Sequence, residues 1–390
     1  MAISIPAYLI PKYEKLLSEL VQSISTSENE RPALALIERH LDSINLPFKR
    51  VPLHPDSSTY CLVASIEGSE KDGQSLILNA HVDTTPVDKP ERWTHPPYSG
   101  HVEDRKLFGR GSLDDKAGVA MLLLLAEILL TETHSLKGNL AFHFVVEDET
   151  SGAGSKALAK AGYSADGVII CDGTWPRRII HAHLGQVFLD VSIRGEAVAA
   201  CVAKRGVNPI DIAYQFISAL KEYEIQTNSE FPVFEELENP CLVNVGSFHS
   251  GAWHGSVPAS AELQIQLSFY HTTPDQILLE VKSLAERVSE RISVSLGSLA
   301  IPPCSRVENN KLKDQLFTIL SERENEEIKC VTVTGHCDMQ YYPTENVCLY
   351  GPGGGGSPHG IDEFYYLDHL PQVGENILEF ISQWCNQIKH

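Results

Sequence analysis

Short apolar runs that alternate with helical segments are the feature that most constrains how this 390-residue chain can fold. Four runs have the length of buried strands: Cys61–Ile66, Leu76–Ala80, Leu140–Val146 and Val168–Cys171. The stretches around them carry apolar residues at helical spacing, over 8–46, Ala117–Leu130 and Lys156–Ala161. This alternation predicts an α/β fold in which helices flank a mostly parallel sheet.

A different pattern begins near residue 184. Leu184–Arg194 and Ala261–Phe269 alternate between apolar and polar residues, which is typical of strands with one buried face. Helical patterns occupy Pro209–Tyr223 and Pro274–Ser289. Together they predict an α+β unit in which two helices cover one face of an antiparallel sheet.

After residue 297 the first pattern returns. Strands are predicted near Cys330–Thr334 and Val347–Tyr350, and a final helix from about Asn376 to Lys389. We therefore predict one discontinuous domain, made of 1–182 and 297–390, into which a smaller domain of residues 183–296 is inserted.

The net charge and the cysteine content indicate which binding partners and which cell compartment to expect. The formal net charge of −20 disfavours nucleic acid and anionic membranes as partners, because both attract basic surfaces. Nine cysteines without a CxxC pair are typical of reduced thiols in a cytoplasmic protein. No signal peptide is evident, and the longest apolar run, Val119–Leu130, is too short to span a bilayer.

Acidic residues and histidines follow the predicted strands at the points where they end. His81 and Asp83 come after SLILNA, the triplet 147–149 after LAFHFVV, and Asp172 after GVIIC. Asp114 opens a helix behind the turn GRGS, and His359 follows a run of four glycines. Ligand sites in open α/β sheets form at the carboxyl ends of strands, so these residues are candidates for one site.

Each of these residues alone has a plainer interpretation. A single histidine can lie on the surface, an acidic triplet can be a solvated turn, and Asp114 can cap its helix. Together they favour a metal site, and imidazole plus carboxylate without thiolate suits zinc, with cobalt or manganese as substitutes. Two histidines and three carboxylates suffice for two ions if Asp114 is shared, and Asp83 can orient His81.

Nearly the whole chain carries an ordered series of motifs: HVDTTPV, WTHPPYSG, LFGRGSLDDKAG, EDETSGAGS, CDG, RGVNPI, SGAWHGSVPA and GPGGGGSPHGIDEF. In these motifs it resembles the family of acetylornithine deacetylase, succinyl-diaminopimelate desuccinylase, aminoacylase and glutamate carboxypeptidase. These proteins are two-zinc amidohydrolases and exopeptidases. The resemblance implies a di-zinc catalytic domain, an inserted lid that often carries a homodimer contact, and a small-molecule amide or acyl amino acid as substrate.

The resemblance also implies roles for the candidate metal ligands. His81 and Asp172 would hold one zinc ion, Glu149 and His359 the other, and Asp114 would bridge both. Family members often have a cis peptide bond after the bridging aspartate, which here joins residues 114 and 115.

Further roles follow for residues around these ligands. Asp83 would support His81, and Asp148 would stand in the place of the general base that takes a proton from water. Asn208, His254 and Gly355 lie in motifs that would contact the substrate.

The sequence departs from the family pattern at three places. Asp148 replaces a glutamate and is one methylene shorter. Its carboxylate oxygen would therefore lie about an ångström from the usual position, and a misplacement of that size can lower the rate on the order of a hundredfold. Ala199 replaces a lid histidine that helps to stabilise the oxyanion, a loss worth about a hundred- to a thousandfold. An introduced substitution at Ala199 is one hypothesis, because the flanking motif is intact. The segment 262–271 lacks the arginine that often grips a substrate carboxylate.

Three functions therefore remain open from the sequence. The first is hydrolysis of an N-acyl amino acid or small peptide, with Asp148 as base. The second is a repurposed site that performs intramolecular cyclisation or acyl transfer, which weakened water activation at Asp148 and Ala199 would favour. The third is a non-catalytic metal-binding protein.

Overall fold

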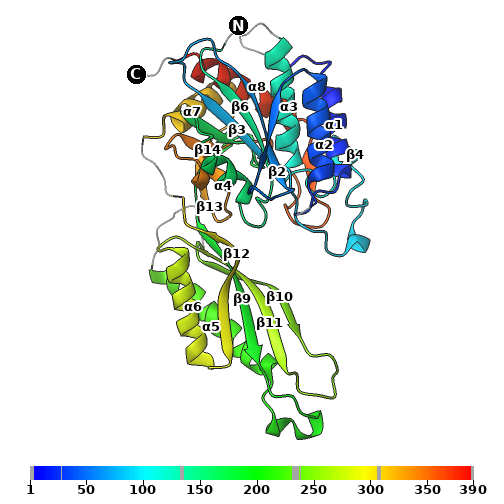
Figure 1. Cartoon of the computed structure of the whole chain (residues 1–390), viewed down its shortest axis with the longest axis vertical. Helices are drawn as coiled ribbons and strands as arrows, with labels where there is room; N and C mark the ends of the chain where they lie inside the picture. Colours follow the sequence, from blue (N-terminus) through cyan, green and yellow to red (C-terminus); the bar gives the residue numbers. More distant parts are fainter. Residues whose placement is uncertain are drawn as a thin grey trace. The chain divides into compact units, whose positions relative to one another are not determined.

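The short apolar runs form the middle of an eight-stranded sheet in the computed structural model (Figure 1). Its strand order is β1-β2-β6-β3-β7-β14-β8-β13. The strands are β1 (Phe48–Pro52), β2 (Tyr60–Ile66), β3 (Leu76–His81), β6 (Leu140–Val145), β7 (Gly167–Ile170), β8 (Arg178–His183), β13 (Lys329–Val333) and β14 (Val347–Leu349). The central strands β6, β3, β7 and β14 are parallel. Antiparallel pairs lie outside them, at β1–β2, β2–β6 and β14–β8.

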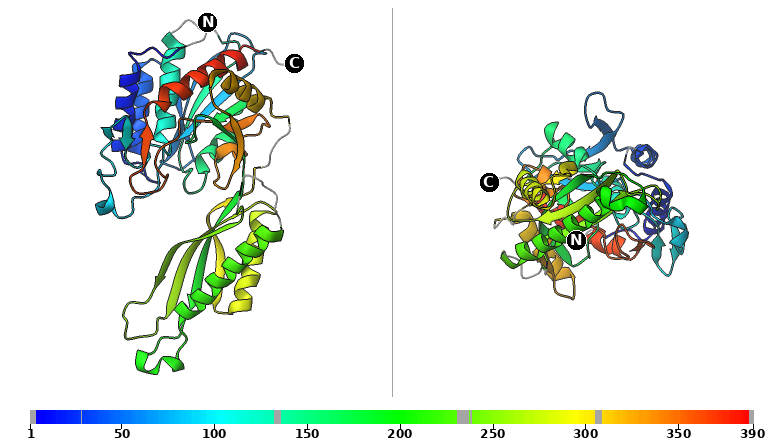
Figure 2. Two further views of the ribbon diagram at one scale, coloured as in Figure 1. Left: turned by 180° about the vertical axis from the view of Figure 1, so that it is seen from behind. Right: turned by 90° about the horizontal axis from the view of Figure 1, so that it is seen from below.

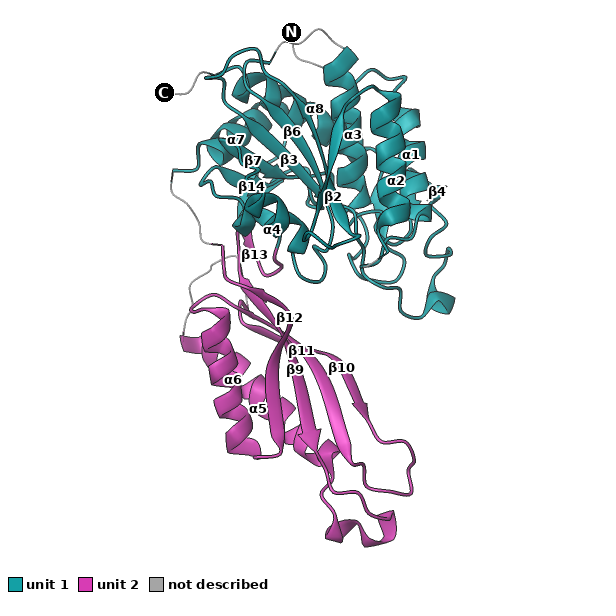
Figure 3. Ribbon diagram, in the orientation of Figure 1, with its two compact units in different colours: residues 1–181, 306–331, 337–390 teal, residues 182–305, 332–336 magenta. Residues whose placement is uncertain are grey.

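The structure describes residues 4–27, 29–131, 136–230, 237, 239–304 and 309–387. The chain divides into two compact units (Figure 3). Unit 1 consists of Met1–His181, Arg306–Val331 and Cys337–His390, and unit 2 of Ala182–Ser305 and Thr332–His336.

Helices cover the large sheet of unit 1, as the α/β prediction requires. They are α1 (Ile10–Gln22), α2 (Arg31–Ser43), α3 (Lys116–Thr131), α4 (Ala153–Lys160), α7 (Lys311–Arg323) and α8 (His369–Trp384). α3 is apolar around most of its circumference and almost wholly buried, because it packs against β3 and lies between α1 and α8. α8 lies beside α3 and α7 in the view from behind (Figure 2).

The final helix differs from its predicted position. α8 begins at His369, seven residues before the predicted start, and ends at Trp384. Pro371 lies in its first turn, where backbone N–H groups have no partner within the helix, so this proline does not interrupt it. Leu370 and Val373 are fully buried and fix this first turn in the core. The last predicted residues, 388–389, lie outside the described part of the chain.

Unit 2 contains an antiparallel sheet of order β10-β11-β9-β12. Its strands are β9 (Gly185–Arg194), β10 (Leu242–Ser250), β11 (Ser260–Phe269) and β12 (Ile292–Ile301). α5 (Pro209–Glu230) and α6 (Pro274–Val288) pack on each other and on this sheet. The buried residues of β9 alternate, as at Leu189, Val191 and Ile193, and form a core with the helices. The α+β arrangement with two helices is therefore confirmed.

A small sheet completes unit 1. It has the order β15-β5-β4 and consists of β4 (His101–Glu103), β5 (Lys106–Phe108) and β15 (Phe364–Tyr366). β5 leads into the GRGS turn, and β15 follows the glycine-rich segment, so this sheet joins two loops that carry candidate ligands. Among the described residues, every helix is too short or too polar to cross a bilayer.

Candidate metal centre

The residues that follow the predicted strands do lie at one edge of the large sheet. His81 is the last residue of β3, Asp172 follows β7, and Glu149 follows β6. Because β6, β3 and β7 are parallel neighbours, their carboxyl ends open to the same side. Asp114 lies just before α3, and His359 lies in the loop between β14 and β15.

The structure brings the five candidate ligands into two groups that share one residue. His81, Asp114 and Asp172 form the first group, and Asp114, Glu149 and His359 the second. Within each group, one ligand atom from each residue lies within 4.8 Å of the others. This is the division that the resemblance implied for two ions with a bridging aspartate.

The two oxygens of Asp114 point to different histidines. Oδ1 lies 2.9 Å from Nε2 of His81, and Oδ2 lies 3.1 Å from Nε2 of His359. Glu149 Oε2 is also 3.1 Å from Nε2 of His359, and Asp172 Oδ1 is 3.9 Å from Nε2 of His81. A carboxylate that offers one oxygen to each group has the geometry of a bridging ligand.

Asp115, rather than Asp114, takes the role of helix cap. Its Oδ1 accepts a hydrogen bond from the backbone N–H of Gly118 at 3.2 Å, in the first turn of α3. Its Oδ2 accepts one from the N–H of His81, also at 3.2 Å. The peptide bond between Asp114 and Asp115 is cis, as the resemblance implied. The plainer interpretation of Asp114 as a cap therefore does not apply, and its side chain is free to face the histidines.

Asp83 supports more of the site than the sequence predicted. Its backbone carbonyl lies 3.0 Å from Nδ1 of His81, and its Oδ1 lies 3.6 Å from the same nitrogen. Its two carboxylate oxygens also accept the backbone N–H groups of Asp148 and Glu149, at 3.2 and 3.1 Å. This fully buried aspartate thus positions one histidine and the acidic segment together.

A buried ion pair that the sequence analysis did not single out holds the loop of Asp114. Glu363 accepts hydrogen bonds from the backbone N–H groups of Gly111, Leu113 and Asp114, at 3.1, 3.0 and 3.3 Å. It also accepts one from Nη1 of Arg110 at 2.7 Å, while Nη2 of Arg110 donates to the carbonyl of His359 at 2.9 Å. Both charged residues stand inside quoted motifs, and that position was the only signal for them.

Asp148 lies beside the first ligand group. Its Oδ2 is 4.0 Å from Nε2 of His81, and its side chain is almost fully buried. Its carboxyl group forms a hydrogen bond with Asp338, which in turn accepts one from Oγ of Ser155 at 2.5 Å. Burial and the charge of Asp338 raise the pKa of Asp148 well above its usual value. No sequence pattern marked Asp338.

The charges of the two groups are arranged around Asp114. Burial opposes its ionisation, but hydrogen bonds from His359 and His81 lower the pKa of Asp114 below its usual value. Burial likewise opposes protonation of His359, yet Asp114 and Glu149 raise its pKa to about 10. The site therefore attracts positive charge strongly at the point that both groups share.

The other two carboxylic acids of the groups, Glu149 and Asp172, are harder to ionise than free ones. Burial, followed by the charge of Asp114, raises the pKa of Glu149 to about 7 and that of Asp172 to about 6. Oε1 of Glu149 is buried and accepts no hydrogen bond from the described residues. Buried carboxylates are costly unless they are paired or coordinate a metal, so this donor set fits divalent cations.

The residues predicted to contact substrate have separate local roles. Oδ1 of Asn208 accepts the N–H of Ile210 at 3.1 Å, at the start of α5. Gly355 pairs with Tyr365, and a Cβ there would lie 2.0 Å from the carbonyl oxygen of Phe364, so only glycine fits. His254 is exposed, with its ring 5.6 Å from that of Trp253.

Ala199 lies on the surface of unit 2. It pairs with Ser256, two residues beyond His254, in an isolated antiparallel bridge. The position of the missing histidine is therefore next to a segment that carries an exposed imidazole.

Comparisons with known proteins show which family and which folds this chain is similar to. A model of the peptidase family M20/M25/M40 matches residues 77–383. A probable succinyl-diaminopimelate desuccinylase of Staphylococcus epidermidis is 25% identical and aligns over 91% of this chain and 93% of its own. Human carnosine dipeptidase 1 has a similar fold, with a TM-score of 0.80, 15% identity, and coverage of 97% and 98%. A dinuclear metal-binding peptidase of Bacillus subtilis gives a TM-score of 0.67, 15% identity, and coverage of 97% and 99%.

The position of Glu363 gives a first prediction. In Glu363→Gln, the amide NH₂ replaces an acceptor oxygen among N–H donors, so the loop of Asp114 loses its fixed orientation. We expect the affinity for Zn²⁺ to fall about ten- to a hundredfold, as measured by titration against a competing chelator.

The matched control is Glu326→Gln, which removes the same charge from a surface ion pair with Arg177. The control should bind Zn²⁺ like the parent protein. Thermal unfolding curves would be measured to establish that each variant is folded at the titration temperature. An unchanged affinity in folded Glu363→Gln would contradict a positioning role.

Proposed function

This chain belongs to the peptidase family M20/M25/M40, and from that premise we propose that it is a zinc-dependent amidohydrolase acting on an N-acyl amino acid or small peptide. The observation that carries the proposal is the pair of ligand groups that share Asp114. The desuccinylase among its relatives carries the name of an enzyme that removes an acyl group from an amino acid, which supports this substrate class.

We assign one ion to His81, Asp114 and Asp172, and the other to Asp114, Glu149 and His359. The mixed imidazole and carboxylate donors support the assignment, and so does Oε1 of Glu149, which is buried without a hydrogen-bond partner among the described residues. Two divalent ions, when bound, supply Lewis acidity to the scissile carbonyl and lower the pKa of the attacking water.

The protein's own groups would move the protons. Asp148 would remove a proton from the attacking water and deliver it to the leaving nitrogen as the C–N bond breaks, so that the products together gain one water. Asp83 fixes the backbone on which Asp148 is carried, and Asp338 holds the carboxyl group of Asp148. The side chain of Asp148 is one methylene shorter than that of glutamate, and these contacts would partly compensate by holding its carboxylate in place.

The metal, the assembly and the compartment belong to the same proposal. Zinc is favoured by the ligand types, with cobalt or manganese as substitutes, and metal analysis of the purified protein tests this.

A homodimer through unit 2 is supported by its exposed apolar side chains, such as Tyr214 and Phe248, and ultracentrifugation tests it. Nine free cysteines support a cytoplasmic location, which fractionation of cells tests.

The domain boundaries are proposed as well. The sequence predicts a metal-binding domain of residues 1–182 and 297–390 and an inserted domain of 183–296. Two separate hydrophobic cores support two domains, one under the large sheet and one between the antiparallel sheet and its two helices. Because β12 (Ile292–Ile301) belongs to the antiparallel sheet, we place the second boundary after Ile301. Expression of the inserted domain alone as a folded protein would test it.

The other two hypotheses from the sequence receive no support from the comparisons. Asp148 and Ala199 suggested cyclisation or acyl transfer, and a non-catalytic metal-binding protein was the third alternative. The family and its relatives are hydrolases. Product mass separates the reactions, because hydrolysis alone adds water.

Metal-dependent hydrolysis is the direct prediction. The purified protein should hydrolyse members of a panel of N-acyl amino acids and dipeptides, lose activity with a chelator and regain it with Zn²⁺. In Asp148→Asn the base is absent while the ligands remain, so kcat should fall about a hundred- to ten-thousandfold with two ions still bound. Kinetics and metal content are measured on the same samples.

Asp72→Asn is the control, because it makes the same change at an exposed position. It should behave like the parent protein. Hydrolysis that persists in Asp148→Asn would remove Asp148 from the mechanism, and conversion of substrate without gain of water would contradict hydrolysis.

We further propose that Ala199 limits turnover, and that Asn208, His254 and Gly355 contact the substrate. Restoring an imidazole in Ala199→His should raise kcat, by up to a hundred- to a thousandfold if it supplies a missing oxyanion donor. Unchanged kinetics in Ala199→His would mean that another group already stabilises the oxyanion.

His254→Ala should raise KM without loss of metal.

A further inference from the structure

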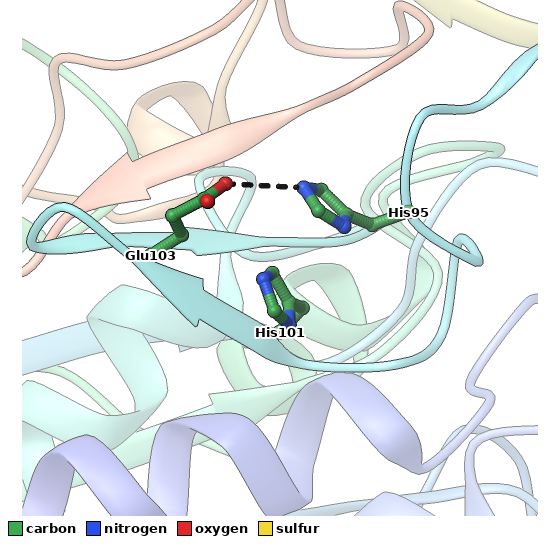
Figure 4. Close-up of side chains that lie close together, drawn as sticks. All are labelled: His95, His101 and Glu103. Atoms are coloured by element: carbon green, nitrogen blue, oxygen red, sulfur yellow. Dashed lines mark ion pairs between the residues drawn. The ribbon is translucent and has the colours of Figure 1, made fainter.

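A second set of metal-binding side chains lies outside the centre described above. His95, His101 and Glu103 gather beside the small sheet of unit 1 (Figure 4). Their ligand atoms lie within 4.8 Å of one another. Nε2 of His95 is 3.6 Å from Oε2 of Glu103, and the rings of the two histidines are stacked with centroids 4.1 Å apart. None of the three takes part in the proposed hydrolysis.

The backbone holds two of these residues in register. His101 and Glu103 are two positions apart on β4, so their side chains project from the same face of the strand. Asp104 and Arg105 both have positive φ and connect β4 to β5 in a tight hairpin. The ring of Phe108, which pairs with His101 on β5, lies 6.4 Å from its ring.

His95 is fixed on both sides by its neighbours. Backbone N and Oγ of Thr94 donate to the carboxylate of Asp362, at 2.7 and 2.8 Å. Two prolines follow His95 and restrict the backbone there. The ring of His95 packs 4.8 Å from that of Phe108, and only 23% of the side chain is exposed. One ligand is thus held in place, while the exposed His101 and Glu103 can rotate towards an ion.

The chemistry of the cluster selects the kind of ligand. Two imidazoles and one carboxylate match zinc sites with three protein ligands, in which a fourth position stays open to water. The same donors suit other borderline ions such as cobalt and nickel better than magnesium or calcium, which prefer oxygen ligands alone. The plainer interpretation is a surface contact between a histidine and a glutamate, which needs no ion and would not explain why a second histidine lies on the first.

We propose that His95, His101 and Glu103 bind a third divalent transition-metal ion, with water in the fourth position. The site is separate from the dinuclear centre, and it shares no ligand with it. Whether this site binds an ion therefore does not depend on the proposed hydrolysis.

Zinc stoichiometry tests the proposal. The full chain is dialysed to equilibrium against excess Zn²⁺, and bound zinc per chain is measured by elemental analysis. The parent protein should bind three ions, and His101→Ala and Glu103→Gln one fewer each, with hydrolytic activity kept. His54→Ala, which removes another exposed histidine, should bind as many ions as the parent.

The outcomes separate this site from the dinuclear centre. If the parent protein binds one ion and His101→Ala binds none, this site is supported and the dinuclear assignment is contradicted. If the parent protein and His101→Ala both bind two ions, the third site is overturned and the dinuclear assignment stays intact. Equal stoichiometry in parent and folded His101→Ala would overturn the proposal in every case.

Discussion

The candidate centre depends on the placement of a single carboxylate, that of Asp114. Its two oxygens face His81 and His359, which come from a strand end and from a distant loop. This geometry requires a fixed loop, and Glu363 fixes it by accepting three backbone N–H groups and the guanidinium of Arg110. Because Arg110 also binds the carbonyl of His359, one buried ion pair aligns both sides of the bridge.

The acidity of the site explains why its parts must be held so firmly. Burial, followed by the negative charge of Asp114, raises the pKa values of Glu149 and Asp172, so keeping these carboxylates ionised side by side is costly. A chain that only needed stability would separate these groups or replace them with apolar residues. Here they stay together at the ends of three parallel strands, whose apolar side chains provide a rigid support. Such an arrangement gains stability when cations are bound, which couples metal binding to folding.

The sequence predicted the α/β class and the five candidate ligands because both leave local signals. Strand ends mark the positions of His81, Glu149 and Asp172, and characteristic motifs mark the other two. The contacts that position them could not be predicted in this way. Glu363 lies 249 residues from Asp114, and Asp338 stands in a segment without periodicity. The three-residue strands of the small sheet are too short to show alternation, and Pro371 concealed the true start of α8.

The most direct test of this account is a crystal structure of the zinc-loaded protein with the ions located by anomalous scattering. The account predicts two ions about 3.5–4 Å apart at the ends of β3, β6 and β7, with one oxygen of Asp114 on each. His81 and Asp172 should complete one ion, and Glu149 and His359 the other. An Asp114 carboxylate that contacts only one ion, or none, would contradict the central claim.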